Sequence, residues 1–168
     1  MDRLNAGVHQ LRRKLLLIMS IDEHTTKLEK ALADLAKTQV QDCLLTTLDM
    51  IGFVKLRLAE NGGNASGGQF TDYSPIYAKK RAEKGLQKDF KDFNVTGQLY
   101  ASIQPEIKAV ELGKVEVSIV PRGADNQAKI AGQLNRDGNI LEPSPAEIKD
   151  ATDAHTRRRL DRAKQIFG

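Results

Sequence analysis

The three histidines, the residue type most often used to bind transition metals or to transfer protons near neutral pH, stand apart from one another. His9, His24 and His155 do not form the pair, four residues apart on a helix, that zinc hydrolases use. The segment Gly63 to Gly68 has roughly the spacing of a phosphate-binding loop, but Gln69-Phe70 follows where that loop needs Lys and Ser or Thr. We therefore expect neither a catalytic metal nor a nucleotide site.

The sequence also lacks the nucleophile motifs of common hydrolases. Its single cysteine, Cys43, stands beside Leu44 in a helical pattern, so a buried apolar thiol is expected rather than a nucleophile. One cysteine excludes an internal disulfide framework. No serine lies in a Gly-x-Ser-x-Gly elbow. We expect no enzyme and no cofactor.

Basic residues gather in one segment. Residues 79–91 hold six basic and two acidic side chains, a net charge of +4 that equals that of the whole chain. Such a run is typical of a solvated helix face, but it can also attract an acidic protein or a nucleic acid. A second cluster, residues 157–162, can meet phosphate or carboxylate, or pair with Glu147, Asp153 and Asp161. The basic residues of the first segment are Lys79, Lys80, Arg81, Lys84, Lys88 and Lys91.

A long helix is the clearest structural prediction. From Ile21 to Glu60 there is no proline and one glycine, Gly52, and aliphatic residues recur every three or four positions. A helix of this length would span about 60 Å, whereas a compact domain of this size has a diameter of roughly 35–40 Å. The helix should break near Gly52 or project towards a partner. Its aliphatic stripe is Leu28, Leu32, Leu35, Val40, Leu44, Leu48, Ile51, Val54 and Leu58.

Turn signals divide the rest of the chain into short elements. An earlier helix is expected over Arg3 to Met19, and the capping box Ser20 to Glu23 marks the start of the long one. Next we expect a flexible glycine-rich loop (61–69) and a helix from Ser74-Pro75 to Gly85. A short helix should then lead into a hairpin with arms 103–110 and 115–120. The last elements are expected to be a helix capped by Asn126 (127–134), a turn (136–139), and a final helix from the capping box Ser144 to Glu147 as far as Phe167.

This order predicts an α+β fold with long N-terminal helices and a small antiparallel sheet. We expect a helical arm (1–60) and an α+β domain (61–168), or one domain with the arm packed on it. The 168 residues are 40% hydrophobic and 29% charged, which is ordinary globular composition, and with 5% aromatics the core should be aliphatic. The apolar run Leu15 to Met19 is too short to cross a membrane, so we expect a soluble protein made in a reducing compartment.

Two segments resemble tail-completion or neck proteins of tailed bacteriophages, a family also described as tail components or virion morphogenesis proteins. Residues 68–85 read GQFTDYSPIYAKKRAEKG, and residues 95–103 read VTGQLYASI. The family pattern is a glycine-rich loop, then Tyr-Ser-Pro-x-Tyr-Ala with a basic helix, then Thr-Gly-x-Leu-x-x-Ser-Ile opening a hairpin. The order of elements matches as far as Phe167, although residues 133–135 and 140–143 depart from the pattern.

The resemblance implies a structural virion protein, made in the host cytoplasm, that forms a ring at the head–tail junction. Such rings often contain six copies and close the tail tube or join it to the neck. The implied partners are sister copies, neck, portal-adaptor or tail-tube proteins, and DNA in the lumen. A ring needs different patches on the two sides of each subunit. The candidate interface or docking residues are Leu44, Leu48, Ile51, Tyr73, Tyr77, Lys79, Lys80, Lys84, Arg157 and Arg158.

A different class of function is a DNA-binding protein that uses the basic helix 76–91. Only four aromatic residues flank these cations, whereas proteins that stack on bases usually place aromatics among their basic residues. Within the ring hypothesis, the loop 62–68 is expected to become ordered on assembly, because fixing a glycine-rich segment costs much conformational entropy. The flanking aromatics are Tyr73, Tyr77, Phe90 and Phe93.

Overall fold

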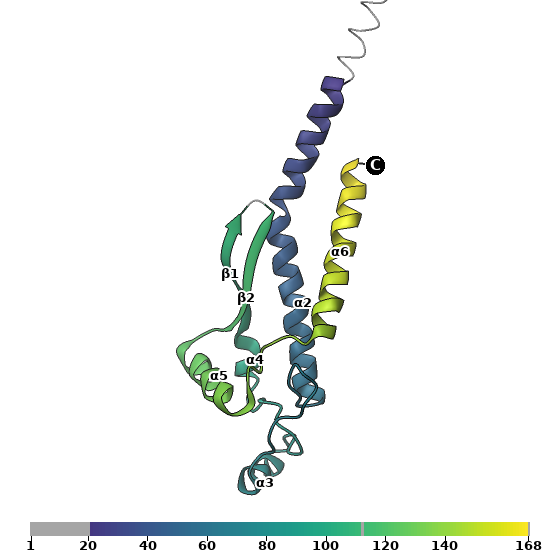
Figure 1. Ribbon diagram of the computed structural model, residues 1–168. Helices are drawn as coiled ribbons and strands as arrows, with labels where there is room; N and C mark the ends of the chain where they lie inside the picture. The colour runs from purple at the N-terminus through teal and green to yellow at the C-terminus, as the bar shows by residue number, and fades with distance from the viewer. Residues whose placement is uncertain (1–20, 112, 168) are drawn as a thin grey trace, which may run out of the picture.

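The computed structural model describes residues 21–111 and 113–167. The helix expected over Arg3 to Met19, and the start of the capping box at Ser20, lie outside these residues. The described chain is a mixture of helices and one small sheet, so the α+β prediction is confirmed. The molecule is elongated, with a helix projecting at one end and α3 (Pro75–Glu83) at the other (Figure 1).

The long N-terminal helix bends at Thr38, not at Gly52. Residues 21–37 are helical, Thr38 is a turn, and α2 (Gln39–Glu60) continues through Gly52 without interruption. At the bend, the Thr38 hydroxyl donates to the carbonyl of Leu35 at 3.0 Å, and Arg159 donates to the same carbonyl at 3.0 Å. These side chains satisfy a carbonyl that a regular helix would bond to its own backbone. The segment before the bend projects beyond the end of α6 (Figure 1), as the length of the helix predicted.

The predicted hairpin is confirmed. The short helix α4 (Gln98–Ser102) leads into β1 (Ile103–Glu111), which pairs antiparallel with β2 (Lys114–Pro121). The register joins Ile103 to Pro121 and shifts by a bulge between Ile107 and Ala109. One face of this two-stranded sheet packs on α2, which a hairpin of this size needs for stability.

The helix after the hairpin is longer than predicted. Helix α5 (Ala124–Asp137) begins after Gly123 rather than at Gln127, and it includes residues that were expected to form a turn. Asn126 does not cap it, because its side-chain amide donates to the carbonyl of Arg122 instead. Gly138, with φ of 79°, ends the helix.

The final helix, α6 (Pro145–Phe167), starts at the predicted capping box. The backbone N–H of Ser144 donates to Glu147 Oε2 at 2.6 Å, and the N–H of Glu147 donates to Ser144 Oγ at 3.3 Å. Helix α6 then runs antiparallel to α2 (Figure 1). The prediction of a helix from this box is therefore confirmed.

Ion pairs join α2 to α6. Asp42, fully buried on α2, lies 3.1 Å from Arg159 and 3.2 Å from Arg162. Arg158 pairs with Asp49 at 2.7 Å. The arginine cluster is therefore largely structural, although its partners lie on α2 rather than at the neighbouring acidic residues expected from the sequence. The candidate docking residue Arg158 is engaged in this way, whereas Arg157 is exposed.

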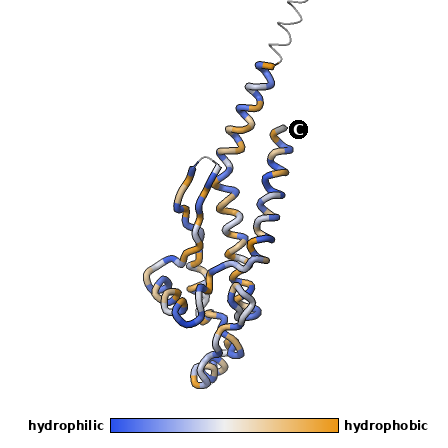
Figure 2. The backbone as a smooth tube through the Cα atoms, viewed as in Figure 1, coloured by the Kyte–Doolittle hydropathy of each residue, from blue (hydrophilic) through white to orange (hydrophobic). Residues whose placement is uncertain are grey.

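The apolar core lies between α2, the hairpin and the loop before α6. Helix α2 supplies Ile51, Val54 and Leu58, so it is part of the main core rather than a separate arm. Figure 2 shows hydrophobic positions recurring along α2 and near the base of the hairpin. The other buried members of this core are Phe70, Ile103, Ile140 and Leu141.

The glycine-rich loop is hydrogen-bonded within the single chain, and its ordering on assembly stays a prediction. The N–H of Asn64 donates to the carbonyl of Gly68 at 2.7 Å, and Arg57 donates to the carbonyl of Gly63. Gly62 has φ of 57°, and a Cβ atom there would lie 2.4 Å from Phe90 Cδ2 and 2.9 Å from the carbonyl oxygen of Lys91. The loop therefore needs glycine at position 62 for both backbone conformation and space.

The variant Gly62→Ala should lose about 3 kcal/mol of unfolding free energy, because it adds a steric clash to the cost of a left-handed alanine. The matched control is Gly67→Ala, where φ is 84° but a Cβ atom meets nothing within 4 Å. That variant should lose about 1 kcal/mol. Urea unfolding followed by circular dichroism measures both, and equal losses would show that the contact with residues 90 and 91 is unimportant.

Candidate docking surface

The end of the molecule formed by α3 and residues 84–97, called the tip below, is built around a buried arginine. Arg81 is 1% exposed, and its Nη2 donates to Asp92 Oδ1 at 2.8 Å and to the carbonyl of Asn94 at 3.0 Å. The same carboxylate oxygen accepts from the hydroxyl of Tyr73 at 3.0 Å. Asp92 therefore ties the start of α3, its last turn and the following loop together.

Two predicted docking residues, Tyr73 and Tyr77, lie side by side on this arginine. Their rings meet edge to face at 5.2 Å, and the Arg81 guanidinium lies 4.6 Å from the Tyr73 ring centroid. Burial, followed by the charge and hydrogen bond of Asp92, raises the pKa of Tyr73 to about 12. Tyr73 is thus mainly structural, whereas Tyr77 remains 40% exposed.

A second ion pair fixes the tip to α5. Lys91 is 8% exposed, and its Nζ lies 2.9 Å from Asp137 Oδ2. Asp137 also accepts from the hydroxyl of Thr71 at 2.8 Å. Burial alone would raise the pKa of Asp137, but the hydrogen bonds from Lys91 and Thr71 and the charge of Lys91 outweigh it and lower that pKa.

The basic patch predicted from the sequence is smaller in the structure. Arg81 and Lys91 face inward, and Lys88 pairs with Asp89 at 2.9 Å. Helix α3 ends at Glu83, so residues 84–91 do not continue a basic helix. The cations left exposed, without an ion pair among the described residues, are Lys79, Lys80 and Lys84.

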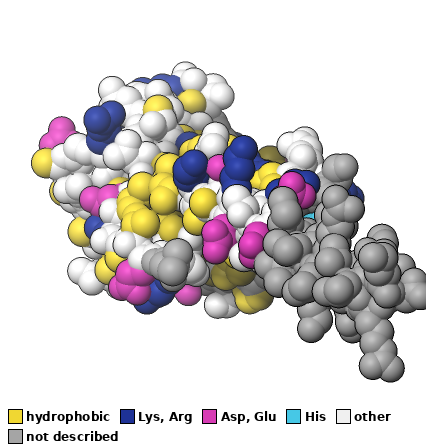
Figure 3. All heavy atoms as spheres, turned by 90° about the horizontal axis from the view of Figure 1, so that it is seen from above, with side chains coloured by type: hydrophobic (Ala, Val, Ile, Leu, Met, Phe, Trp, Pro, Cys, Tyr) yellow, Lys and Arg dark blue, Asp and Glu magenta, His cyan; other side chains and the backbone are white. Residues whose placement is uncertain are grey.

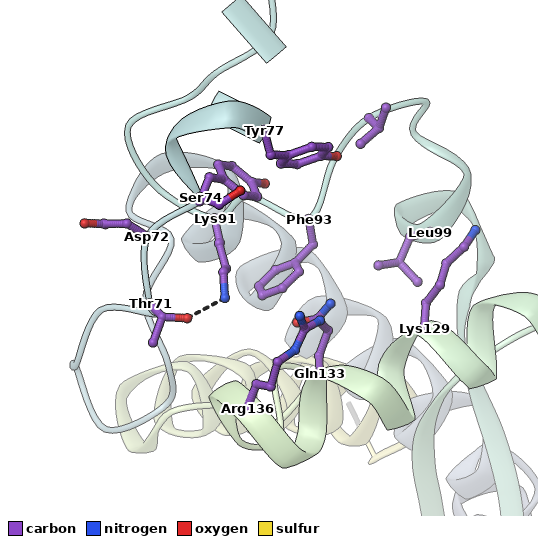
Figure 4. Close-up of a pocket in the computed structure, with 12 residues that line it drawn as sticks. Thr71, Asp72, Ser74, Tyr77, Lys91, Phe93, Leu99, Lys129, Gln133 and Arg136 are labelled. Atoms are coloured by element: carbon purple, nitrogen blue, oxygen red, sulfur yellow. Dashed lines mark hydrogen bonds between the residues drawn. The ribbon is translucent and has the colours of Figure 1, made fainter. Parts of the chain in front are cut away.

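A pocket of about 620 Å³ lies between the tip and α5 (Figure 4). One wall is formed by the start of α3, and the ring of Phe93 points into the middle. The opposite wall is formed by α5. The α5 residues that line the pocket are four and three positions apart, so they lie on one face of the helix. These α5 residues, which sequence reasoning missed although their helical spacing was visible, are Lys129, Gln133 and Arg136.

Exposed apolar side chains of the tip, of which Val95 lines the pocket, make the tip a candidate docking surface. Ile76 is 75% exposed, and Val95 is 45% exposed. Exposed apolar groups of this kind, bordered by charged residues, are typical of protein–protein contacts. The docking surface is defined below as Ile76, Tyr77, Val95, the pocket and the lysines of α3.

The predicted interface residues of α2 lie away from the tip and differ in exposure. Ile51 is buried in the core and Leu44 is half-buried, so neither is free to meet a partner. Leu48 is 48% exposed and lies on a face of α2 turned away from both α6 and the sheet. The face of α2 that includes Leu48, called the α2 outer face, carries Leu45, Leu48, Gly52, Leu56 and Ala59. Figure 3, which views the molecule from above, shows that hydrophobic side chains also reach the surface at that end, among charged ones.

Among the residues described, no group of three or more His, Cys, Asp or Glu side chains is placed to hold a metal ion. Cys43 is partly buried next to the α2–α6 contact, and burial is the main cause that raises its pKa. A raised pKa keeps the thiol protonated and poorly nucleophilic. Within residues 21–111 and 113–167, no helix combines the length and apolarity of a membrane span.

Replacing Asp92 with Asn should lower the free energy of unfolding by about 3 kcal/mol, because the buried Arg81 charge loses its partner. The control Asp89→Asn removes a carboxylate from an exposed pair on the same loop and should cost less than about 0.5 kcal/mol. Urea unfolding gives both values, and near-ultraviolet circular dichroism should show altered tyrosine packing in the first variant only. Equal, small losses would mean that Arg81 does not organise the tip.

No protein-family model, curated protein or solved structure matches the chain.

Proposed function

We propose that the chain is a structural subunit of a tailed bacteriophage, which forms a ring at the head–tail junction and docks there through its tip. The observation that carries this proposal is that one chain exposes two different apolar surfaces. The α2 outer face lies along the side of the molecule, and the docking surface lies at one end. A ring subunit needs lateral contacts with its sister subunits, for which the α2 outer face is one candidate patch, and a ring that joins layers needs a further surface at one end.

The sequence resemblance supports the same proposal. Its two segments, residues 68–85 and 95–103, form the loop that enters α3, α3 itself, α4 and the first residue of β1. These elements build the docking surface and connect it to the core. The part of the chain that resembles neck and tail-completion proteins is thus the part that presents apolar and basic groups to a partner.

The DNA-binding alternative has less support. It depended on a basic helix over 76–91, but two of its six cations are internal and the helix ends at Glu83. The exposed lysines Lys79, Lys80 and Lys84 can meet an acidic protein surface as well as DNA. A salt-sensitive gel shift with the purified chain separates these partners, since phosphate contacts weaken steeply as salt rises.

Electron microscopy of virus particles that carry a labelled copy of the chain tests the proposal directly. We expect the label to form a ring around the particle axis between head and tail, whereas the purified chain should be monomeric or weakly associated by native mass spectrometry. A single copy on the axis, or no copy in the particle, would refute the proposal.

The double variant Leu45→Glu/Leu48→Glu should abolish ring formation while the chain still folds, because both side chains are exposed in the single subunit and would be buried without ion-pair partners in the ring. The matched control is Thr156→Glu/Gln165→Glu, which adds the same two negative charges at exposed positions of α6, outside the α2 outer face, and should assemble normally. Particle yield and ring density provide the measurement. Normal particles with the double variant would exclude the α2 outer face as a subunit contact.

A further inference from the structure

We propose that the pocket between α3 and α5 binds an extended acidic segment of a neighbouring protein, with an apolar side chain of that segment inserted over Phe93. This inference deepens the proposed function, because it names the chemistry of the partner that the docking surface receives. It rests on the pocket's shape, its apolar floor, and the positive charge of one wall.

The interior of the pocket is apolar and large enough for side chains of a partner. Phe93 lies near its middle and Leu99 at one side (Figure 4), and Val95 is a further apolar lining residue. The volume of about 620 Å³ lies within the range of pockets that bury a small organic ligand. An aromatic or leucine side chain would therefore gain hydrophobic stabilisation by entering it.

The α5 wall supplies positive charge that the fold does not use. Neither Lys129 nor Arg136 has an ion pair among the described residues, and Arg136 is exposed. Lys91, the third cation of the pocket, is already neutralised by Asp137. Asp72 is the carboxylate on the lining, so the two α5 cations outnumber it. The exposed lysines of α3 add to this positive potential, which favours an acidic ligand.

The spacing of these cations indicates an extended ligand. Lys129 and Arg136 lie seven residues apart on a helix, or about 10 Å along its axis. A chain in the extended polyproline II conformation has three residues per turn and rises about 3.1 Å per residue, so side chains three positions apart lie on the same side, about 9 Å from each other. A segment with acidic residues three positions apart and an apolar residue between them would thus match both cations and the floor. The side-chain hydroxyls of Ser74 and Tyr77, which have no hydrogen-bond partner among the described residues, can donate to its carbonyls.

The aromatic rings of the pocket favour a peptide over single-stranded DNA. Tyr73 is packed by Arg81 and Tyr77, and Phe93 is packed edge-on by Phe70 at 5.1 Å. These contacts limit the free ring faces on which nucleic-acid bases would stack. A side chain inserted among the rings requires no such face.

A fluorescent peptide with the core Glu-Ser-Phe-Glu in a neutral sequence tests the proposal by fluorescence anisotropy with the full chain. We expect saturable binding with a Kd on the order of 10–500 μM, as for a short contact of this kind. Two control peptides, Lys-Ser-Phe-Lys and Glu-Ser-Ser-Glu, should bind at least about tenfold more weakly, since one reverses the charge and the other removes the apolar group.

The variant Lys129→Glu/Arg136→Glu should weaken binding of the acidic peptide at least about tenfold and improve binding of the lysine peptide. Its control, Lys149→Glu/Lys164→Glu, makes the same change in net charge on the distant helix α6, at exposed lysines, and should bind like the unchanged chain. Equal unfolding midpoints in urea would exclude a general loss of structure. Binding of the acidic peptide that both double variants retain would overturn the proposal.

Other outcomes identify other occupants and also overturn it. One is binding that does not saturate up to about 1 mM peptide. The others are tighter binding of an oligonucleotide than of the peptide, and self-association of the chain that only the α5 variant removes.

The same variant in virus particles separates this inference from the proposed function. If rings form and dock normally with Lys129→Glu/Arg136→Glu, the pocket inference fails and the ring proposal stands. If the peptide binds as expected but no ring is seen, the ring proposal fails alone.

Discussion

Burying the guanidinium of Arg81 removes a full positive charge from water, a transfer that costs several kcal/mol unless the charge is paired and hydrogen-bonded. Asp92 provides the opposite charge, loop carbonyls accept further hydrogen bonds, and the ring of Tyr73 covers the guanidinium face. Tyr73 precedes α3, whereas Asp92 and the accepting carbonyls lie in the loop that follows α3. The tip therefore keeps its shape only while this arginine is enclosed, and the pocket walls depend on that shape.

Helix α2 explains why the molecule has an uncovered apolar side as well. One face meets α6 mainly through carboxylate–arginine pairs at Asp42 and Asp49. A second face buries Ile51, Val54 and Leu58 against the hairpin and the adjoining loops. The sheet has only two strands, and α6 lies along the other side, so neither can cover the third face. The exposed leucines there follow from this small number of packing elements, and a second subunit can cover them.

Local signals in the sequence predicted elements well, and distant contacts explain most of the differences. The capping box at Ser144 and the proline start of α3 depend on neighbouring residues, and both appear in the structure; β2 also forms, but its exposure alternates only over residues 114–117. The bend at Thr38 also depends on Arg159, more than 120 positions away, which donates to the Leu35 carbonyl. The basic patch has fewer exposed cations than predicted because contacts within the fold enclose some of them.

Charge counted along the chain does not reveal which cations are enclosed. Lys91 finds its carboxylate 46 residues later, on a helix whose length was underestimated. That underestimate also hid the pocket, because its second wall includes Arg136, which had been expected in a turn. Tyr73 and Tyr77 lie together at the tip, and their role in docking stays a prediction; Arg81, which they contact, is buried, although it was counted in the basic patch predicted from the sequence.

The central claim is that the α2 outer face and the tip are both covered when the chain is in place in a virus particle. Hydroxyl-radical footprinting with mass spectrometry compares the purified chain with the chain in intact particles, residue by residue. We predict that Leu48 and Tyr77, both exposed in the single chain, lose reactivity with hydroxyl radicals in the particle, while buried Phe70 stays unreactive in both samples. Unchanged reactivity of Leu48 and Tyr77 in particles that contain the chain would contradict it.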